Sequence, residues 1–174
     1  MMTGRRILFV CTANICRSPA AEYMARHFVT EDDYLFRSAG FMYDGRPIVD
    51  KMGEAISRFG VTDSHKHSSH IIDPDTMAAA ELILTMESRH LRDLTVKDRS
   101  VFDKTIPFRQ AVSLLDRPMS LDEFLASITD REASSYFDDR WDVEDPYKRS
   151  TKKYKDASDE IKTLVTDFFT NLKP

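Results

Sequence analysis

The chain has 174 residues, of which 41% are apolar and 31% are charged, a composition typical of one globular domain and not of a disordered or fibrous chain. Its 25 basic and 29 acidic side chains give a net charge of −4, so we expect neither nucleic acid nor a membrane surface as a partner. No stretch approaches the ~18 apolar residues of a membrane span or resembles a signal peptide, and two cysteines make no disulfide framework, so we expect free thiols and a cytoplasmic location.

Strands and helices are predicted to alternate along the chain. In chain order, the patterns predict a buried strand at about 5–11, a helix at 19–29, a strand at 34–40, a helix at 47–60, a short helix and a strand within 73–86, a helix at 88–94, a strand at 104–109, a helix at 121–128 and an amphipathic helix at 152–172. Ser18, directly before Pro19, is predicted to be the N-cap of the first helix.

This alternation predicts an α/β fold over residues 1–174. We expect a single-domain three-layer sandwich, in which a four-stranded parallel sheet has helices on both faces. In such sheets, ligands bind beyond the carboxyl ends of the strands. Cys11 occupies that position after the first strand, at the start of the loop CTANICRS. This loop is therefore the first candidate for a functional site.

The loop contains the residue types of an anion site with a nucleophile. Inward-pointing amides, together with the positive end of the following helix dipole, would bind a phosphoryl group. Arg17, six positions after Cys11, would bind two of its oxygens, and the same field would stabilise a thiolate at Cys11. Ser18 would donate a hydrogen bond to the sulfur. The alternative is that Cys11 is an ordinary buried cysteine at the end of a strand.

The segment VCTANICRSPAAEYMAR resembles the active-site segment of the low-molecular-weight protein tyrosine phosphatases. Further matches follow in order, at RSAG (37–40), HKHSSHI (65–71), ELILTMESRHLRDL (81–94) and DPY (145–147). Together they span most of the chain except about 110–143. That segment is longer than we expect in this family, and it contains an apparent extra helix and the single tryptophan, Trp141. It either shapes the entrance of the site or is an acidic surface excursion.

The resemblance implies a phosphatase that acts through a cysteinyl-phosphate intermediate and needs no metal and no cofactor. It implies that Asp145, which precedes Pro146, is the general acid and base, because the leaving phenolate needs a proton and the attacking water needs a base. Asp73, in the other Asp-Pro pair, fits a helix-start turn better. The phosphate-binding loop would comprise Thr12, Ala13, Asn14, Ile15, Cys16, Arg17 and Ser18.

Several residues are expected to support this loop. Asn14 favours a left-handed conformation, and the resemblance implies that it shares a hydrogen-bond network with Ser18 and His67. Ala13 stands where the family usually has glycine, and we expect a small side chain to suffice. Four of the five histidines lie between 65 and 90, but no cysteine or paired acid completes a metal site. Cys16 is either a small apolar residue or a redox partner that closes a reversible disulfide with the loop nucleophile.

The predicted substrate is a phosphotyrosine-containing protein, with inorganic phosphate as product. The apolar Ile15 suits an aromatic ring, Tyr147 would form one wall of a deep slot, and Phe41 or Tyr43 would form the other. The alternative is a protein arginine phosphatase, whose relatives place Thr at the position of Ile15. An arsenate reductase would need further cysteines outside the loop. A third interpretation, a non-catalytic phosphopeptide-binding module, would not need both a nucleophile and an acid.

Overall fold

A parallel sheet forms the centre of the molecule. Within residues 4–30, 33–129 and 138–174, which the computed structural model describes, the sheet has four strands in the order β2-β1-β3-β4. The register places Ile7 beside Phe36 on one side and beside Leu82 on the other. The predicted four-stranded parallel sheet is therefore confirmed. Its strands are β1 (Arg5–Val10), β2 (Tyr34–Ala39), β3 (Leu82–Thr85) and β4 (Thr105–Pro107).

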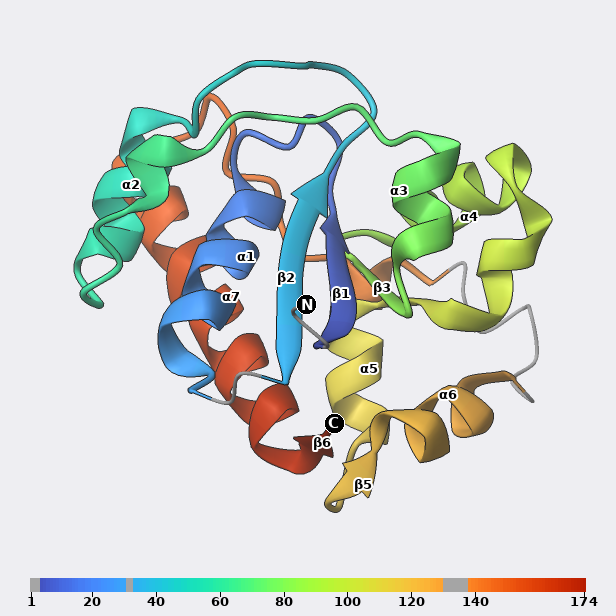
Figure 1. Cartoon of the computed structure of the whole chain (residues 1–174). Coiled ribbons are helices and arrows are strands. Elements are labelled where there is room, and N and C mark those ends of the chain that lie inside the picture. The colour runs from blue at the N-terminus through green and yellow to red at the C-terminus, as the bar shows by residue number, and fades with distance from the viewer. Residues whose placement is uncertain (1–3, 31–32, 130–137) are drawn as a thin grey trace.

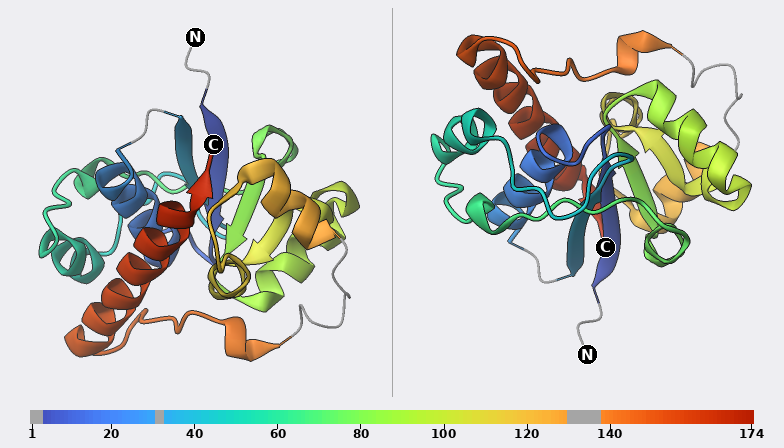
Figure 2. Two further views of the ribbon diagram at one scale, coloured as in Figure 1. Left: turned by 90° about the horizontal axis from the view of Figure 1, so that it is seen from below. Right: turned by 90° about the horizontal axis from the view of Figure 1, so that it is seen from above.

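Helices cover both faces of the sheet, which gives the three layers that the alternation predicts (Figure 1 and Figure 2). One face carries α1 (Arg17–Phe28), α5 (Phe108–Leu114) and α7 (Thr151–Asn171), flanked by α2 (Asp50–Ser57) and α6 (Leu121–Thr129). The other face carries α3 (Pro74–Ala79) and α4 (Ser88–Lys97). Shorter elements connect these layers, namely η1 (Ser64–Lys66), η2 (Arg99–Lys104), η4 (Asp139–Trp141) and the paired strands β5 (Met119–Ser120) and β6 (Leu172–Lys173).

Alternation along β1 divides the core between the two faces. Ile7 and Phe9 pack on the side of α1 and α7, whereas Leu8 and Val10 pack on the side of α3 and α4. Phe9 and Phe108 have ring centroids 5.5 Å apart, and such aromatic pairs contribute about 0.5–1.5 kcal/mol beyond the burial of their surface. This packing fixes the carboxyl end of β1, from which the candidate loop starts.

The start of α1 differs from the prediction. The helix begins at Arg17, Cys16 occupies the N-cap position, and no side chain caps the helix. Ser18 lies inside the first turn, and Pro19 is the third helical residue instead of the first. The predicted N-cap role of Ser18 is wrong, because contacts within the loop already engage its hydroxyl.

The predicted strand at 104–109 in fact covers the end of one element and the start of another. β4 ends at Pro107 and α5 begins at Phe108, and both of these residues are buried, so no exposed polar residue marks the change from strand to helix. The segment 110–143 contains the rest of α5, then β5, α6 and η4, and its residues 130–137 lie outside the described part. In the described ranges, no helix is both long and apolar enough to cross a bilayer.

Candidate active site

The loop of residues 11–16 joins β1 to α1 at the carboxyl edge of the sheet, at the top of Figure 1. Asn14 has a φ of 53°, the left-handed conformation that the sequence indicates, whereas Ala13 has no positive φ and is unstrained as an alanine. Gly40, at the end of β2, lies directly against this turn. A Cβ atom on Gly40 would lie 2.7 Å from the backbone nitrogen of Asn14, so a larger residue would push the loop away.

A hydrogen-bond network directs the hydroxyl of Ser18 toward the sulfur of Cys11. Asn14 Nδ2 donates to Ser18 Oγ over 2.9 Å and to Ser38 Oγ over 2.8 Å. Because Ser18 Oγ accepts this bond, it keeps its own proton for Cys11 Sγ, which lies 3.0 Å away, or for the carbonyl oxygen of Ala39 at 3.4 Å. A hydroxyl donor at that distance stabilises a thiolate. Cys11 is 2% exposed, and it lines the pocket in front of the loop.

His67 supports the loop from behind. Its Nε2 lies 2.7 Å from the carbonyl oxygen of Asn14, so this nitrogen carries the proton and donates it to the carbonyl. Burial lowers the pKa of His67, which leaves the ring neutral near pH 7. The backbone N–H of His70 donates to Asn14 Oδ1 over 2.8 Å. These bonds hold Asn14 in its left-handed conformation, and they place His67 as a support of the loop, away from the sulfur.

Arg17 lies at the centre of the site with 1% of its side chain exposed. Nη1 donates to the carbonyl oxygen of Val143 over 2.8 Å and pairs with Glu87 Oε1 at 2.6 Å, and Nη2 pairs with Asp145 Oδ2 at 3.0 Å. Among the described residues, no acceptor binds the buried Nε of Arg17. A buried N–H without an acceptor is costly. Nε and Nη2 together have the geometry for two parallel bonds to a phosphoryl group.

The start of α4 supplies three side chains that the sequence analysis did not assign, those of Glu87, Arg89 and His90. Glu87 pairs with both Arg17 and Arg89. Burial alone would raise the pKa of Glu87, but these two cationic partners lower it to about 2. The sequence does contain a signal for these three residues. The segment MESRH follows β3, and the candidate loop follows β1, so both lie at the carboxyl edge of the same parallel sheet.

The contacts of His90 determine how the hydroxyl of Thr12 is used. The backbone N–H of Glu87 donates to His90 Nδ1 over 3.1 Å, so Nε2 carries the proton and donates to Thr12 Oγ1 over 3.0 Å. Arg89 Nη2 also donates to Thr12 Oγ1, over 2.7 Å. Arg17 Nη2 is a third donor near this oxygen, at 3.5 Å. Since these donors engage the lone pairs of the hydroxyl, its own proton is available to an acceptor in the pocket.

A pocket of about 190 Å³ opens in front of Cys11. Tyr43 and Tyr147 line it as the sequence analysis expects, and Met42 lines it where Phe41 was expected as the alternative wall. Phe41 instead stacks on His90, with ring centroids 5.7 Å apart. The full lining consists of Cys11, Thr12, Ala13, Ile15, Cys16, Arg17, Met42, Tyr43, Asp145 and Tyr147.

Other candidates from the sequence lie apart from the reacting groups. Asp73 caps α3 by accepting from the backbone N–H of Thr76 over 2.7 Å, which is the helix-start role. Cys16 is a buried free thiol, and burial raises its pKa well above the ordinary value, so it is protonated near pH 7. Its disulfide with Cys11 stays a prediction. In the described part of the chain, no group of three or more His, Cys, Asp or Glu side chains is placed to hold a metal ion.

The buried His90 should make stability fall as the solution becomes acidic. Burial lowers the pKa of His90 from 6.5 to about 3. The unfolded chain therefore takes up a proton between these values that the folded chain does not, so the contribution is complete above pH 6.5 and is lost as the pH falls toward 3. The free energy of unfolding, measured in urea between pH 7 and pH 4, should fall with decreasing pH. His90→Asn should reduce the slope of that fall by up to ~1.4 kcal/mol per pH unit. The exposed His65, changed to Asn, is the matched control, and equal slopes in all three proteins would contradict the assignment.

Sequence comparisons place this chain among known proteins. The family described as "Low molecular weight phosphotyrosine protein phosphatase" matches residues 6–114. An arsenate reductase of Staphylococcus aureus is 35% identical over 85 residues, which cover 49% of this chain and 62% of that protein. The low molecular weight protein-tyrosine-phosphatase PtpB of Staphylococcus epidermidis is 35% identical over 86 residues, which cover 49% of this chain and 58% of that protein. The chain thus spans less than two thirds of the length of these relatives.

Solved structures are similar over nearly the whole chain. The YwlE arginine phosphatase from Geobacillus stearothermophilus has a TM-score of 0.76 and 24% identity, and the match covers 95% of this chain and 91% of that one. A low molecular weight protein tyrosine phosphatase from T. tengcongensis has a TM-score of 0.74 and 26% identity, with 96% and 99% of the two chains covered. The fold is therefore shared by proteins named for two different phosphorylated side chains.

Proposed function

Because this chain belongs to the low molecular weight phosphotyrosine protein phosphatase family, we propose that it hydrolyses phosphotyrosine in proteins through a phosphocysteine at Cys11. The observation that carries the proposal is the arrangement around one sulfur. Cys11 Sγ lies 3.0 Å from the hydroxyl of Ser18, and the buried Arg17 and the acid Asp145 line the same pocket. The nucleophile, the anion-binding cation and the proton donor that the reaction needs are thus adjacent.

In the first step, the Cys11 thiolate attacks phosphorus, an S–P bond forms and the P–O bond to the leaving phenol breaks. Asp145 gives its proton to the leaving oxygen, so no phenolate is released. Arg17 Nε and Nη2 and the first amides of α1 bind the equatorial oxygens, where charge is concentrated. In the second step, water attacks phosphorus, Asp145 accepts its proton, and the S–P bond breaks to release inorganic phosphate and the Cys11 thiolate.

The ion pair between Asp145 and Arg17 connects binding to proton transfer. The Asp145 carboxylate lies 3.0 Å from Arg17 Nη2, on the guanidinium edge that a phosphoryl dianion would use. The dianion would compete with Asp145 for this nitrogen. Displacement would release the Asp145 carboxyl group from the guanidinium and leave it beside the bound phosphoryl group, where the leaving oxygen lies.

Asp145→Asn should lower kcat by about 10²- to 10³-fold, because a positioned general acid contributes that much. The loss should be larger for phenyl phosphate, whose leaving group is a strong base, than for an activated nitrophenyl ester. KM should not rise, since the variant removes a competitor for Arg17. The matched control is Glu144→Gln, the neighbouring exposed acid, which pairs with Lys153 at 2.8 Å and should keep its rate. Equal losses with both leaving groups would refute the acid role of Asp145.

The walls of the pocket favour an aryl phosphate. Ile15, Met42 and the rings of Tyr43 and Tyr147 give an apolar lining above the sulfur. Arg46 lies over the ring of Tyr43 at 5.3 Å, and Lys148 lies over the ring of Tyr147 at 5.5 Å. Each of these two tyrosine rings thus has a cation beside it, which favours the approach of a phosphate dianion.

The substrate class is tested by measuring the hydrolysis rates of one enzyme preparation on three substrates, with a chelator present. The substrates are an aryl phosphate, a phosphotyrosine peptide and a phosphoarginine peptide. We expect the phosphotyrosine peptide to be preferred over the phosphoarginine peptide. Ile15→Thr should shift the ratio of the two rates toward phosphoarginine. Ile15→Val, whose side chain has nearly the same shape as threonine but no hydroxyl, should not. A preference of the wild type for phosphoarginine would support the arginine phosphatase, and tight phosphate binding without turnover would support the non-catalytic module.

A protein arsenate reductase is disfavoured because this sequence contains only Cys11 and Cys16, and such enzymes relay electrons through cysteines outside the loop. We propose a phosphotyrosine protein as the partner, inorganic phosphate as the product and the cytoplasm as the location.

A further inference from the structure

A groove of about 1300 Å³ runs along β2, at the edge of the sheet. In the described part of the chain, β2 pairs along its length with β1 alone, and α3 lies over β1 and β3 without covering the outer strand (Figure 1). Register places Arg37 beside Leu8 and Leu35 beside Arg6, so all four side chains are on the face that carries α3. Leu35 is half-buried and the two arginines are exposed, which gives the groove an apolar floor with charged margins.

The charge of this groove is opposite to that of the molecule. Arg6, Arg26, Arg37 and Lys66 line it, with Glu22 as its acidic side chain, although the whole chain has a net charge of −4. Glu22 is buried, pairs with Arg26 and accepts a hydrogen bond from Ser38, and Arg37 also interacts with it electrostatically. The side chains of Arg37 and Lys66 are themselves exposed, so both remain accessible to a partner.

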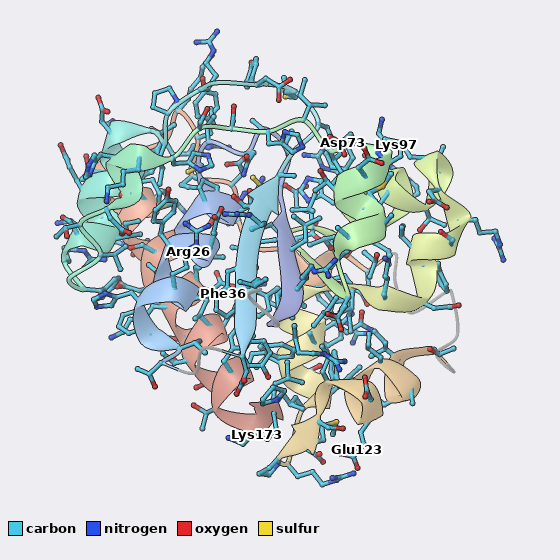
Figure 3. The ribbon with its side chains drawn as sticks, viewed as in Figure 1. Arg26, Phe36, Asp73, Lys97, Glu123 and Lys173 are labelled. Carbon is cyan, nitrogen blue, oxygen red and sulfur yellow. The ribbon has the colours of Figure 1, made fainter. Side chains whose placement is uncertain are left out.

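The middle of the edge is protected against the addition of another strand. Arg26 Nη2 donates to the carbonyl oxygen of Phe36 over 3.0 Å, and Figure 3 shows Arg26 extending from α1 to β2. Its guanidinium therefore occupies a backbone acceptor that an added strand would need. A partner in this groove must then be recognised through its side chains, by the exposed cations and the apolar floor.

We propose that this groove binds an acidic segment of a protein substrate, extended along β2. Asp and Glu side chains of the segment pair with Arg37, Lys66 and Arg6, and an apolar side chain packs on Leu35. The groove ends at Ser38, which receives a hydrogen bond from Asn14 of the catalytic loop, so it lies behind the active site and does not share its pocket. The segment is thus distinct from the phosphorylated residue. Its role in choosing substrates rests on the proposed function, whereas the binding itself does not.

The test uses a fluorescent, unphosphorylated peptide of about ten residues, long enough to span β2, rich in Asp and Glu with one leucine. The comparison peptide has Asn and Gln in place of the acids. We expect the wild type to bind the acidic peptide and not the neutral one. The double variant Arg37→Glu and Lys66→Glu should weaken binding by roughly tenfold or more. The matched control is Lys97→Glu with Lys173→Glu, which changes the net charge equally at two exposed lysines outside the groove (Figure 3).

Four results would overturn the proposal. The first three are no binding by the wild type, equal losses in both double variants, and displacement of the peptide by inorganic phosphate, which would place the peptide in the catalytic pocket. The fourth is tighter, groove-dependent binding of a single-stranded oligonucleotide, which would assign the groove to nucleic acid instead. Hydrolysis of a small aryl phosphate should be unchanged in both double variants, and this also confirms their folding. Binding without any such hydrolysis by the wild type would refute the proposed function and leave the groove as a binding site.

Finally, a phosphotyrosine peptide with an acidic extension should have a higher kcat/KM than one with a neutral extension. The groove variant should abolish this difference, and the control variant should keep it. A difference that persists in the groove variant would place the recognition of acidic substrates elsewhere on the protein.

Discussion

Replacement of Cys11 by serine should lower kcat on an aryl phosphate by on the order of 10⁴-fold or more, the scale seen when a covalent nucleophile is removed. A serine hydroxyl is a far weaker acid than a thiol. The hydroxyl of Ser18, 3.0 Å from the sulfur, can stabilise an anion at this position but cannot remove a proton to create one. Asp145, which lines the same pocket, has to carry a proton in the first step and so cannot also take one from the serine.

Binding should survive this change. The amides of the loop and the guanidinium of Arg17 remain, so Cys11→Ser should still bind inorganic phosphate, and this is measurable by its effect on thermal unfolding. The matched control is Cys16→Ser, the same chemical change five positions later. Cys16 is buried, and burial raises its pKa, so this thiol is protonated near pH 7. The Cys16→Ser variant is therefore expected to retain activity within about tenfold. Retained turnover in Cys11→Ser, or its loss only in Cys16→Ser, would refute the choice of nucleophile.

The predicted site residues that the structure brings together in one loop belong to a short continuous motif. Cys11, Arg17 and Ser18 lie within one loop, so local chemistry alone relates them, and the strand before and the helix after them fix which way they face. The strand and helix alternation likewise depends on local periodicity, and the four-stranded sheet follows from it. Such features are readable because each depends on neighbours in the chain.

The residues that were missed reach the site from distant segments. Glu87, Arg89 and His90 are contributed by α4, and Val143 contributes only its carbonyl oxygen, which no side-chain pattern reveals. Their roles depend on which strands are neighbours, and this order is not readable from local periodicity. Phe41 was predicted as a possible pocket wall, but its neighbour Met42 lines the pocket instead, for a related reason. The direction of each side chain after β2 is set by the turn that brings Gly40 against the loop, and this turn depends on long-range contacts.

Arg17→Lys should lower kcat/KM by about 10³-fold, although it keeps the positive charge. The guanidinium holds Val143 and Glu87 with one nitrogen, Asp145 with another, and has Nε free for substrate. An ammonium group is a single point charge and cannot reproduce this planar set of donors. Both kcat and phosphate affinity should fall, whereas Cys11→Ser should lower kcat alone. A variant with near wild-type kcat/KM would show that Arg17 holds the fold and does not bind substrate.

Arg17→Ala should also destabilise the protein, by about 3 kcal/mol, because it leaves Glu87 buried with one cation fewer. Glu87 has a folded pKa of about 2, below its ordinary 4.5, so its contribution to stability is complete above pH 4.5 and is lost as the pH falls toward 2. Without Arg17, the pKa of Glu87 should rise and this pH dependence should weaken.

A double variant separates the lost ion pair from simple loss of packing. Glu87→Gln keeps the shape of the side chain and removes its charge, so Arg17→Ala with Glu87→Gln should be more stable than Arg17→Ala alone, although it carries one more substitution. Urea unfolding at pH 7 measures the difference. If the double variant is instead the less stable of the two, the cost of removing Arg17 comes from the cavity it leaves, and Glu87 does not depend on Arg17 for its charge. Activity should remain low in both proteins, since neither can bind the phosphoryl oxygens with a guanidinium.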